Sequence, residues 1–294
     1  MIVVARRYGQ LGNRLILASH LMAAAREYGL VFANPSFAEY ADLFPSTMRD
    51  VWCRFPQETS LSQEPTRLRR ELAARTVYGI AKGLWTCGLR KHPYRVIRIS
   101  QGQSCDVEGD EFLSAVYGDQ HVLTMGWLFR GPRLVQKHAD AIRQYFRITD
   151  PHQQRVDSVI RKIRGESDLV VGVHIRQGDY ATFKNGMYYY STAQYATMMH
   201  QIAEQFPGKR VAFLVCSNSS FERRAFGKLQ VYPGPGHLVE DMYALAATDL
   251  MVGPPSTYTG WAAFYGRRPR AVIEYAEDPV NVATLLKSNA LDAA

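Results

Sequence analysis

Short apolar runs alternate with amphipathic stretches along the chain from residue 168 onward. The runs have the length of strands and the stretches have helical spacing, an alternation typical of a doubly wound parallel sheet. In such a sheet, ligands bind at the carboxyl ends of the strands. The expected strands are 169–175, 211–215, 229–231, 250–252 and 271–273, and the expected helices are 191–206, 219–226, 238–247, 257–265 and one after Pro279.

The N-terminal half opens with a strand-helix-strand unit. An apolar strand at 2–5 leads through a glycine-rich turn into a helix at 13–28, and a strand at 30–33 follows Gly29. The stretch from 34 to 165 is less regular, so fewer elements are predicted there. They are a strand at 121–125 and helices at 134–146 and 153–163.

A chain of 294 residues has the length of two ordinary domains. We therefore predict an α/β fold of two Rossmann-like domains, 1–160 and 161–294, with a hinge near 150–168. The last helix is expected to pack back on the first domain.

The net charge of +8 and the pI near 9.3 favour anionic partners. Much of the excess lies between Pro65 and Arg98, where nine basic residues meet one acidic residue, Glu71, among apolar ones. Such a segment is either a solvated basic helix over the core or a contact with an acidic membrane surface. The sequence has neither an RNP-like nor a helix-turn-helix signature, so nucleic acid is not expected as a partner.

No apolar stretch approaches the length of about 18 residues that a spanning helix needs, and the chain opens without a signal segment. A cytoplasmic protein is therefore expected, with peripheral contact at the inner face of the membrane if residues 65–98 bind lipid. The four cysteines lack disulfide or zinc-ligand spacing. Asp-x-Asp is also absent from the sequence, which argues against a carboxylate pair holding a divalent ion on a nucleotide sugar. Neither a metal nor a cofactor is expected.

The most informative stretch is Val173-His-Ile-Arg-Gln-Gly-Asp-Tyr180. A strand at 169–175 places His174 and Arg176 on one side of the sheet at its carboxyl end. A guanidinium there suits phosphate, and Asp179 could orient it or a substrate hydroxyl. The structural alternative is an Arg176–Asp179 ion pair with His174 satisfied in the core.

A hydroxyl-rich turn at 252–261 lies between a predicted strand and a predicted helix. Ser256 or Thr257 can cap the helix, and the first amides with both hydroxyls could hold a pyrophosphate. Capping alone is the structural alternative, and it needs only one hydroxyl. Upstream, Asp241 either compensates a helix dipole or accepts from a guanine ring.

Two further segments are weaker candidates. Gly9-Gln-Leu-Gly12-Asn13-Arg14 joins a strand to a helix, and its glycines allow close approach of a ligand. Residues 183–190, with Lys184, Tyr188 and Tyr190, follow the arginine motif. They line an acceptor cleft, or they form an ordinary Asn-Gly turn.

Three of these segments, the arginine motif, the N-terminal glycine turn and the hydroxyl-rich turn, together resemble motifs of the α1,2-fucosyltransferases and their α1,6- and protein O-fucosyltransferase relatives. The motifs are 174–180, 9–13 and 249–261, and they occur in the family's order. The resemblance implies a GT-B fold, GDP-β-L-fucose as donor, inversion at the sugar carbon and no required metal. The acceptor it implies is a hydroxyl of a glycan, such as a bacterial surface polysaccharide or a lipid-linked glycan.

The resemblance also implies roles for single residues. Arg176 corresponds to the arginine that holds the β-phosphate, His174 lies beside the nucleotide, and Asn13 lies near the transferred sugar. The donor-binding set is Gly9, Gly12, Asn13, His174, Arg176, Asp241, Ser256 and Thr257, and the catalytic candidates are Arg176, Asp179 and Asn13.

The sequence departs from the family at two places. Gln177 stands where a second arginine is usual, and the 254–261 turn reads Pro-Pro-Ser-Thr-Tyr-Thr-Gly-Trp. Two alternatives therefore stay open, a transferase for a different nucleotide sugar and a non-enzymatic basic binding protein.

Overall fold

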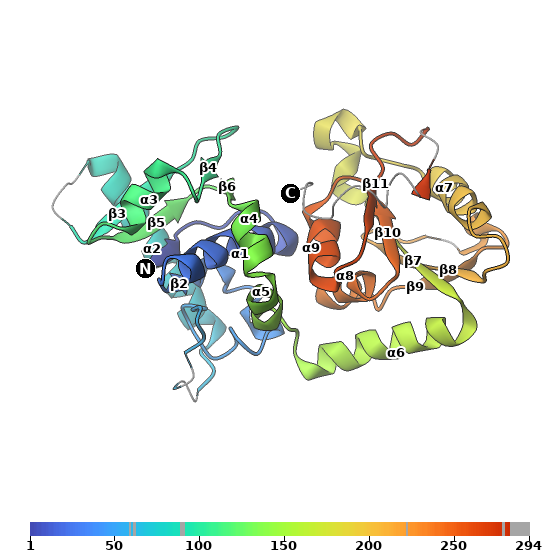
Figure 1. Cartoon of the computed structure of the whole chain (residues 1–294), viewed down its shortest axis with the longest axis horizontal. Coiled ribbons are helices and arrows are strands. Elements are labelled where there is room, and N and C mark those ends of the chain that lie inside the picture. Colours follow the sequence, from blue (N-terminus) through green and yellow to red (C-terminus); the bar gives the residue numbers. More distant parts are fainter. Residues whose placement is uncertain (59, 61–62, 89–91, 222, 278–279, 283–294) are drawn as a thin grey trace. The chain divides into compact units, whose positions relative to one another are not determined.

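A computed structural model describes residues 1–58, 60, 63–88, 92–221, 223–277 and 280–282. The chain forms two compact units, Met1–Thr149 and Asp150–Ala294 (Figure 1). The division falls before helix α6 (Asp150–Glu166), about ten residues ahead of the expected boundary at 160. The reason is that α6 packs on the second unit, where Arg164 binds Asp249 at 2.9 Å.

The first unit is built on a parallel four-stranded sheet of order β2-β1-β5-β3. The two central strands, β1 and β5, are apolar and mostly buried, because a parallel sheet is covered on both faces. The four strands are β1 (Ile2–Val4), β2 (Phe32–Ala33), β3 (Tyr94–Arg98) and β5 (His121–Met125). A two-stranded pair joins β4 (Cys105–Asp106) to β6 (Phe129–Arg130).

The first helix of this unit, α1 (Leu11–Glu27), is buried along most of its length. Helices that are apolar all round belong inside the protein, and α1 is flanked by α4 (Pro132–Lys137), β6 and β2. The remaining elements are η1 (Pro35–Phe37), η2 (Ala41–Leu43), α3 (Asp110–Val116), α4 (Pro132–Lys137) and α5 (Ala139–Tyr145).

The basic segment contains a long helix, α2 (Arg67–Cys87), that begins at a Thr66 cap and ends at Gly88 in the left-handed conformation. One face is buried, with Val77 in the core and Arg70 only 1% exposed. The other face is solvated and carries Leu68 and Leu72, which are 78% and 63% exposed. The helix therefore covers the core and also presents apolar and basic side chains to solvent.

The second unit contains a parallel five-stranded sheet of order β11-β10-β7-β8-β9, which confirms the doubly wound prediction. Its strands are β7 (Leu169–Ile175), β8 (Val211–Ser217), β9 (Gln230–Pro233), β10 (Leu250–Gly253) and β11 (Arg270–Val272).

Helices cover both faces of this sheet. Alternate β7 residues such as Val171 and Val173 pack on α7 (Thr192–Glu204). On the opposite face, Gly172 lies so close to α8 (Leu238–Ala246) that an added Cβ would be 2.9 Å from Leu245. The other elements of the unit are η3 (Gly178–Ala181), η4 (Phe183–Gly186), η5 (Arg223–Phe226) and α9 (Thr257–Gly266).

Several expected elements differ from the observed ones. The helix predicted at 134–146 is two helices that meet at His138. The helix predicted at 219–226 is reduced to η5, and the expected last helix lies outside the described residues. No helix in the described part of the chain is long and apolar enough to cross a membrane.

Candidate functional site

The candidate site lies at the carboxyl edge of the second sheet, where three parallel strands end side by side. Strand β7 is central, with Val252 of β10 opposite Val173 and Ser217 of β8 opposite Ile175. This register brings the residues after β7, β8 and β10 to the same edge. The prediction from open α/β sheets is that a ligand binds there.

His174 is buried on the face of the sheet that α8 and α9 cover. Its ring stacks on that of Tyr258, with centroids 5.0 Å apart and planes at 26°. The Tyr258 hydroxyl donates to the Leu238 carbonyl at 2.6 Å, which ties α9 to α8. Gly253 passes so near that an added Cβ would lie 3.0 Å from the His174 carbonyl oxygen, so the close strand contact favours glycine.

Arg176 follows β7 directly and is half-buried. Its guanidinium carbon lies 4.8 Å from the centre of the Tyr180 ring, a cation–π distance. The Tyr180 hydroxyl donates to the Pro255 carbonyl at 2.7 Å, so the ring that holds the arginine is itself fixed to the 254–256 turn. The side chain of Asp179 lies outside the described part of the structure, and its catalytic role and its ion pair with Arg176 stay predictions.

The hydroxyl-rich turn caps α9 with Ser256, whose Oγ accepts from the Tyr258 amide at 3.1 Å. Thr257 is the first helical residue, and its hydroxyl is not the capping group. Beneath the turn, the buried Arg270 donates to the Ser256 carbonyl at 2.9 Å and to Thr259 Oγ1 at 3.2 Å. Burial lowers the Arg270 pKa to about 10, still cationic at neutral pH. The helix dipole and this charge both favour an anion at the turn.

Asp241 lies in the first turn of α8, and its Oδ1 accepts from the Gly236 amide at 2.8 Å. Burial raises the Asp241 pKa to about 6, against the Gly236 hydrogen bond that lowers it. An added Cβ at Gly234 would lie 2.7 Å from this carboxylate and 2.7 Å from Cys216 Sγ. The carboxylate is therefore closely surrounded by the β9–α8 loop. Its contacts go beyond those needed to compensate the α8 helix dipole.

The segment after the arginine motif contains an aromatic group. Tyr180 and Phe183 stack with centroids 5.3 Å apart, and Tyr188 lies 6.4 Å from Phe183. The exposed Lys184 places its Nζ 5.4 Å from the Tyr188 ring centre. Tyr190 does not belong to this surface. It is 2% exposed and donates to the Ile273 carbonyl at 2.7 Å, so the expectation that it lines an acceptor cleft is wrong.

The N-terminal turn is described within the first unit. Gly9 has φ +59°, and a Cβ there would lie 2.1 Å from Asn13 Nδ2, so side chain and turn fit only with glycine. Gly12 and Asn13 lie in the first turn of α1, which has no side-chain cap and no acidic residue. Arg14 is buried and donates to Glu39 at 3.0 Å. Donor binding by Gly9, Gly12 and Asn13 stays a prediction.

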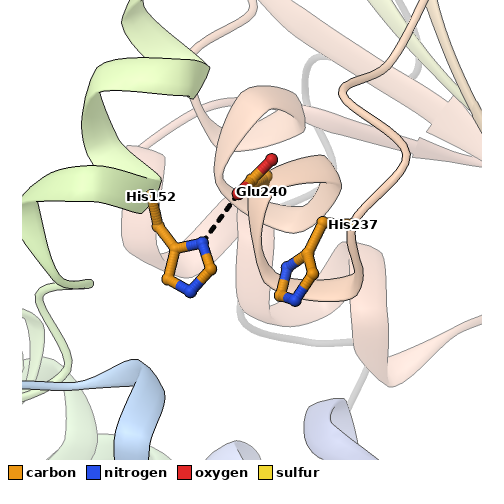
Figure 2. A group of neighbouring side chains, drawn as sticks. All are labelled: His152, His237 and Glu240. Atoms are coloured by element: carbon orange, nitrogen blue, oxygen red, sulfur yellow. Dashed lines mark hydrogen bonds and ion pairs between the residues drawn. The ribbon is translucent and has the colours of Figure 1, made fainter.

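His152, His237 and Glu240 form a group with ligand atoms within 4.8 Å of one another (Figure 2). The buried Glu240 carboxylate binds His152 Nδ1 at 2.7 Å and Arg155 Nε at 2.5 Å. The two imidazole rings stack with centroids 4.7 Å apart. The Glu240 carboxylate is already paired with the Arg155 guanidinium. We therefore interpret the group as an ion-paired joint between α6 and α8 and not as a metal site. The sequence did not suggest it, because His152 and Glu240 are 88 residues apart.

Replacing Glu240 by Gln is expected to lower the free energy of unfolding by about 1–3 kcal/mol, because two charge-assisted hydrogen bonds that the buried carboxylate accepts are lost. Urea unfolding of the purified chain measures the change. Glu204→Gln, an exposed substitution on α7, is the control and should change stability by less than about 0.5 kcal/mol. Equal stability of the two variants would contradict the ion-paired joint.

Sequence reasoning missed three residues that build this site. Tyr180 positions Arg176, and Arg270 supports the α9 turn. Asn218, after β8, accepts from the Gln177 amide at 2.9 Å through Oδ1 and so fixes the backbone that follows Arg176. Two of them had a signal, since Tyr180 ends the 174–180 motif and Asn218 follows a predicted strand at the same edge.

Solved structures with a similar fold include several fucosyltransferases. FUT1 of Arabidopsis thaliana, solved as a mutant in complex with GDP, superposes with a TM-score of 0.58 at 12% identity, over 95% of this chain and 72% of that one. Fucosyltransferase NodZ from Bradyrhizobium superposes with a TM-score of 0.53 at 13% identity, over 95% and 96%. NodZ α-1,6-fucosyltransferase soaked with GDP-fucose gives a TM-score of 0.52 at 13% identity, over 93% and 94%.

No protein-family model matches the sequence, and no curated protein matches it. At these identities the likeness concerns the fold. The chain therefore has the α/β fold of solved fucosyltransferase structures, the fold that its three motifs predicted.

Proposed function

We propose that the chain is an inverting, metal-independent glycosyltransferase that moves L-fucose from GDP-β-L-fucose to a hydroxyl of a glycan acceptor. The observation that carries the proposal is the convergence of Arg176, the α9 N-terminus and the buried Arg270 at one edge of a parallel sheet. The Arg176 guanidinium and the α9 amides are donors suited to a diphosphate, and the buried Arg270 adds positive charge beneath the turn. Fold neighbours solved with GDP and with GDP-fucose support the choice of donor.

In this proposal the bond between the sugar carbon and the β-phosphate oxygen breaks as GDP leaves. Arg176 and the α9 N-terminus neutralise the negative charge that grows on the β-phosphate. The acceptor oxygen then bonds to the opposite face of the sugar carbon, which inverts it, and the acceptor proton passes to Asp179 or to solvent. Preorganised charge of this kind is typically the largest single contribution to rate.

In this proposal three groups of residues would bind the donor and determine which nucleotide sugar is accepted. Asp241 would accept from the guanine ring, His174 would lie beside the nucleotide through its stacked Tyr258, and the Gly9–Asn13 turn would approach the transferred sugar. Arg176 with Arg270 supplies the positive charge that a divalent ion supplies in other nucleotide-sugar enzymes. We further propose that Lys184 and Tyr188 contact the acceptor, since Lys184 is exposed, Tyr188 is partly exposed, and the Lys184 Nζ lies near the Tyr188 ring.

The test is turnover of GDP-fucose and of GDP-mannose in EDTA, with GDP release as the readout and NMR to assign the anomer of the product. Release of GDP from GDP-fucose in EDTA supports the proposal. Release from GDP-mannose alone would assign a different sugar, and release that depends on added Mg²⁺ would contradict metal independence.

We also propose peripheral contact with acidic membrane through the exposed face of α2. Leu68 and Leu72 are exposed there, Trp85 is 47% exposed, and basic side chains flank them. Such a face buries apolar side chains at the lipid surface while its charges meet anionic headgroups. We expect the protein to float with liposomes containing phosphatidylglycerol but not with neutral liposomes, and equal flotation with both would reject the contact.

A further inference from the structure

A pocket of about 450 Å³ opens in the first unit at the carboxyl ends of β1, β3 and β5. Arg6 and Tyr8 follow β1, Arg98 ends β3, and Trp127 follows β5, with the 99–103 loop completing the wall. The strands are parallel, so this edge of the first sheet corresponds to the edge that forms the candidate site in the second. Neither the motifs nor the proposed donor site uses this pocket.

The charge of the pocket wall is entirely positive. Arg6 and Arg98 are its charged lining residues, and the lining includes no carboxylate. Among the described residues, neither arginine forms an ion pair with an acid. The neighbouring Arg7 differs, since its guanidinium binds Glu71 at 2.5 Å. The two lining arginines thus keep their charge available, while the arginine beside them is neutralised.

Aromatic rings hold both guanidinium groups in place. The Arg6 guanidinium carbon lies 5.2 Å from the Tyr8 ring centre, and that of Arg98 lies 5.6 Å from the Trp85 ring centre. Both arginines act electrostatically on the Tyr8 hydroxyl, where they oppose the rise in its pKa that burial causes. Both arginines line the pocket together with Tyr8.

A third cation, Arg130, is not a lining residue of the pocket, but it lies against the ring of the lining residue Trp127. Arg130 stacks on Trp127 at 4.5 Å and is fixed by donation to the Trp127 and Phe129 carbonyls at 3.0 and 2.9 Å. Burial lowers the Arg130 pKa to about 10, so it stays charged at neutral pH. Fixed guanidinium forks match the geometry of carboxylate and phosphate oxygens, and aromatic faces suit the apolar face of a sugar ring.

We propose that this pocket binds a saccharide that carries a negative group, a carboxylate or a phosphate, and that the acceptor of the reaction is therefore an acidic glycan. The first part stands on the pocket alone. The second rests on the proposed function, because it takes the chain to be a glycosyltransferase.

The experiment is ligand-observed NMR titration of the whole 294-residue chain, first without and then with saturating GDP, using glucose, glucuronic acid, glucose 1-phosphate and inorganic phosphate. We expect glucuronic acid or glucose 1-phosphate to bind about tenfold or more tightly than glucose. The preferred one tells whether the group is carboxylate or phosphate. Arg6→Gln and Arg98→Gln should each weaken that binding by about fivefold or more, and Arg161→Gln on the exposed face of α6 should leave it unchanged.

Three results would overturn the inference: equal binding of glucose and the acidic sugars, equal binding of inorganic phosphate and glucose 1-phosphate, or displacement of the sugar by GDP. The last would assign the pocket to the nucleotide. If the wild-type protein binds the acidic sugar without binding GDP, the proposed function fails and the pocket assignment stands. Arg98→Lys, which keeps the charge without the fork, should retain part of the binding, and this confirms that a folded protein is being measured.

Discussion

Arg176→Ala is expected to lower turnover of GDP-fucose by about a hundredfold or more, the largest single effect that the structure implies. The guanidinium sits at the end of the central strand and is held by a ring that is fixed to the turn capping α9. In the proposed mechanism the guanidinium neutralises the leaving group, so removing it should take away that charge while the fold around it is kept. GDP release under saturating GDP-fucose measures the loss.

Two further variants separate charge from geometry. Arg176→Lys keeps the charge but not the planar fork, so we expect an intermediate loss of about tenfold. Arg161→Ala, exposed on α6, should retain wild-type turnover. A turnover above one tenth of wild type in Arg176→Ala would remove this residue from the catalytic role.

Asp241→Asn is expected to make the protein more stable at pH 7.5 and less able to bind GDP. The Asp241 pKa is raised to about 6 from an ordinary 3.8, so between pH 4 and 6 the folded state keeps a proton that the unfolded state has lost. Stability contributed by this group therefore falls as pH rises through that window, by about 2–3 kcal/mol in total. Asparagine keeps an oxygen for the Gly236 amide and removes the charge.

Urea unfolding at pH 4.5 and 7.5 measures this difference. The variant should show a smaller fall in stability between the two pH values than wild type, and the exposed Asp157→Asn should behave as wild type. An unchanged pH dependence in Asp241→Asn would contradict the raised pKa. Unchanged affinity for GDP would contradict the guanine contact separately.

Strands that are buried on both faces were predicted closely. β5 and β7 match the expected 121–125 and 169–175, because a covered parallel strand is a continuous apolar run. β3 was missed, because it is an edge strand in which Arg95 and Arg98 are exposed, and its sequence resembles the basic helix before it. The extent of α2 also needed the structure, since much of its surface is solvated.

Part of the site was also predictable from local sequence patterns. Arg176, Ser256 and Asp241 stand at strand ends or helix starts, which periodicity locates. Tyr180 and Arg270 act through contacts that span the sheet, such as the bond from Tyr180 to Pro255 across 75 residues, and no local pattern encodes these. Tyr190 was misplaced because an aromatic residue after a turn has the same local sequence whether it packs inward or outward.

The central claim is that the edge formed by β7, β10 and α9 binds a guanosine diphosphate without a metal ion. Calorimetric titration of the purified protein with GDP and with UDP in EDTA tests it most directly, repeated with Arg176→Ala. We expect GDP to bind at least about tenfold more tightly than UDP, and the variant to lose most of that affinity. Equal binding of GDP and UDP, no binding of either, or full binding by the variant would contradict the account.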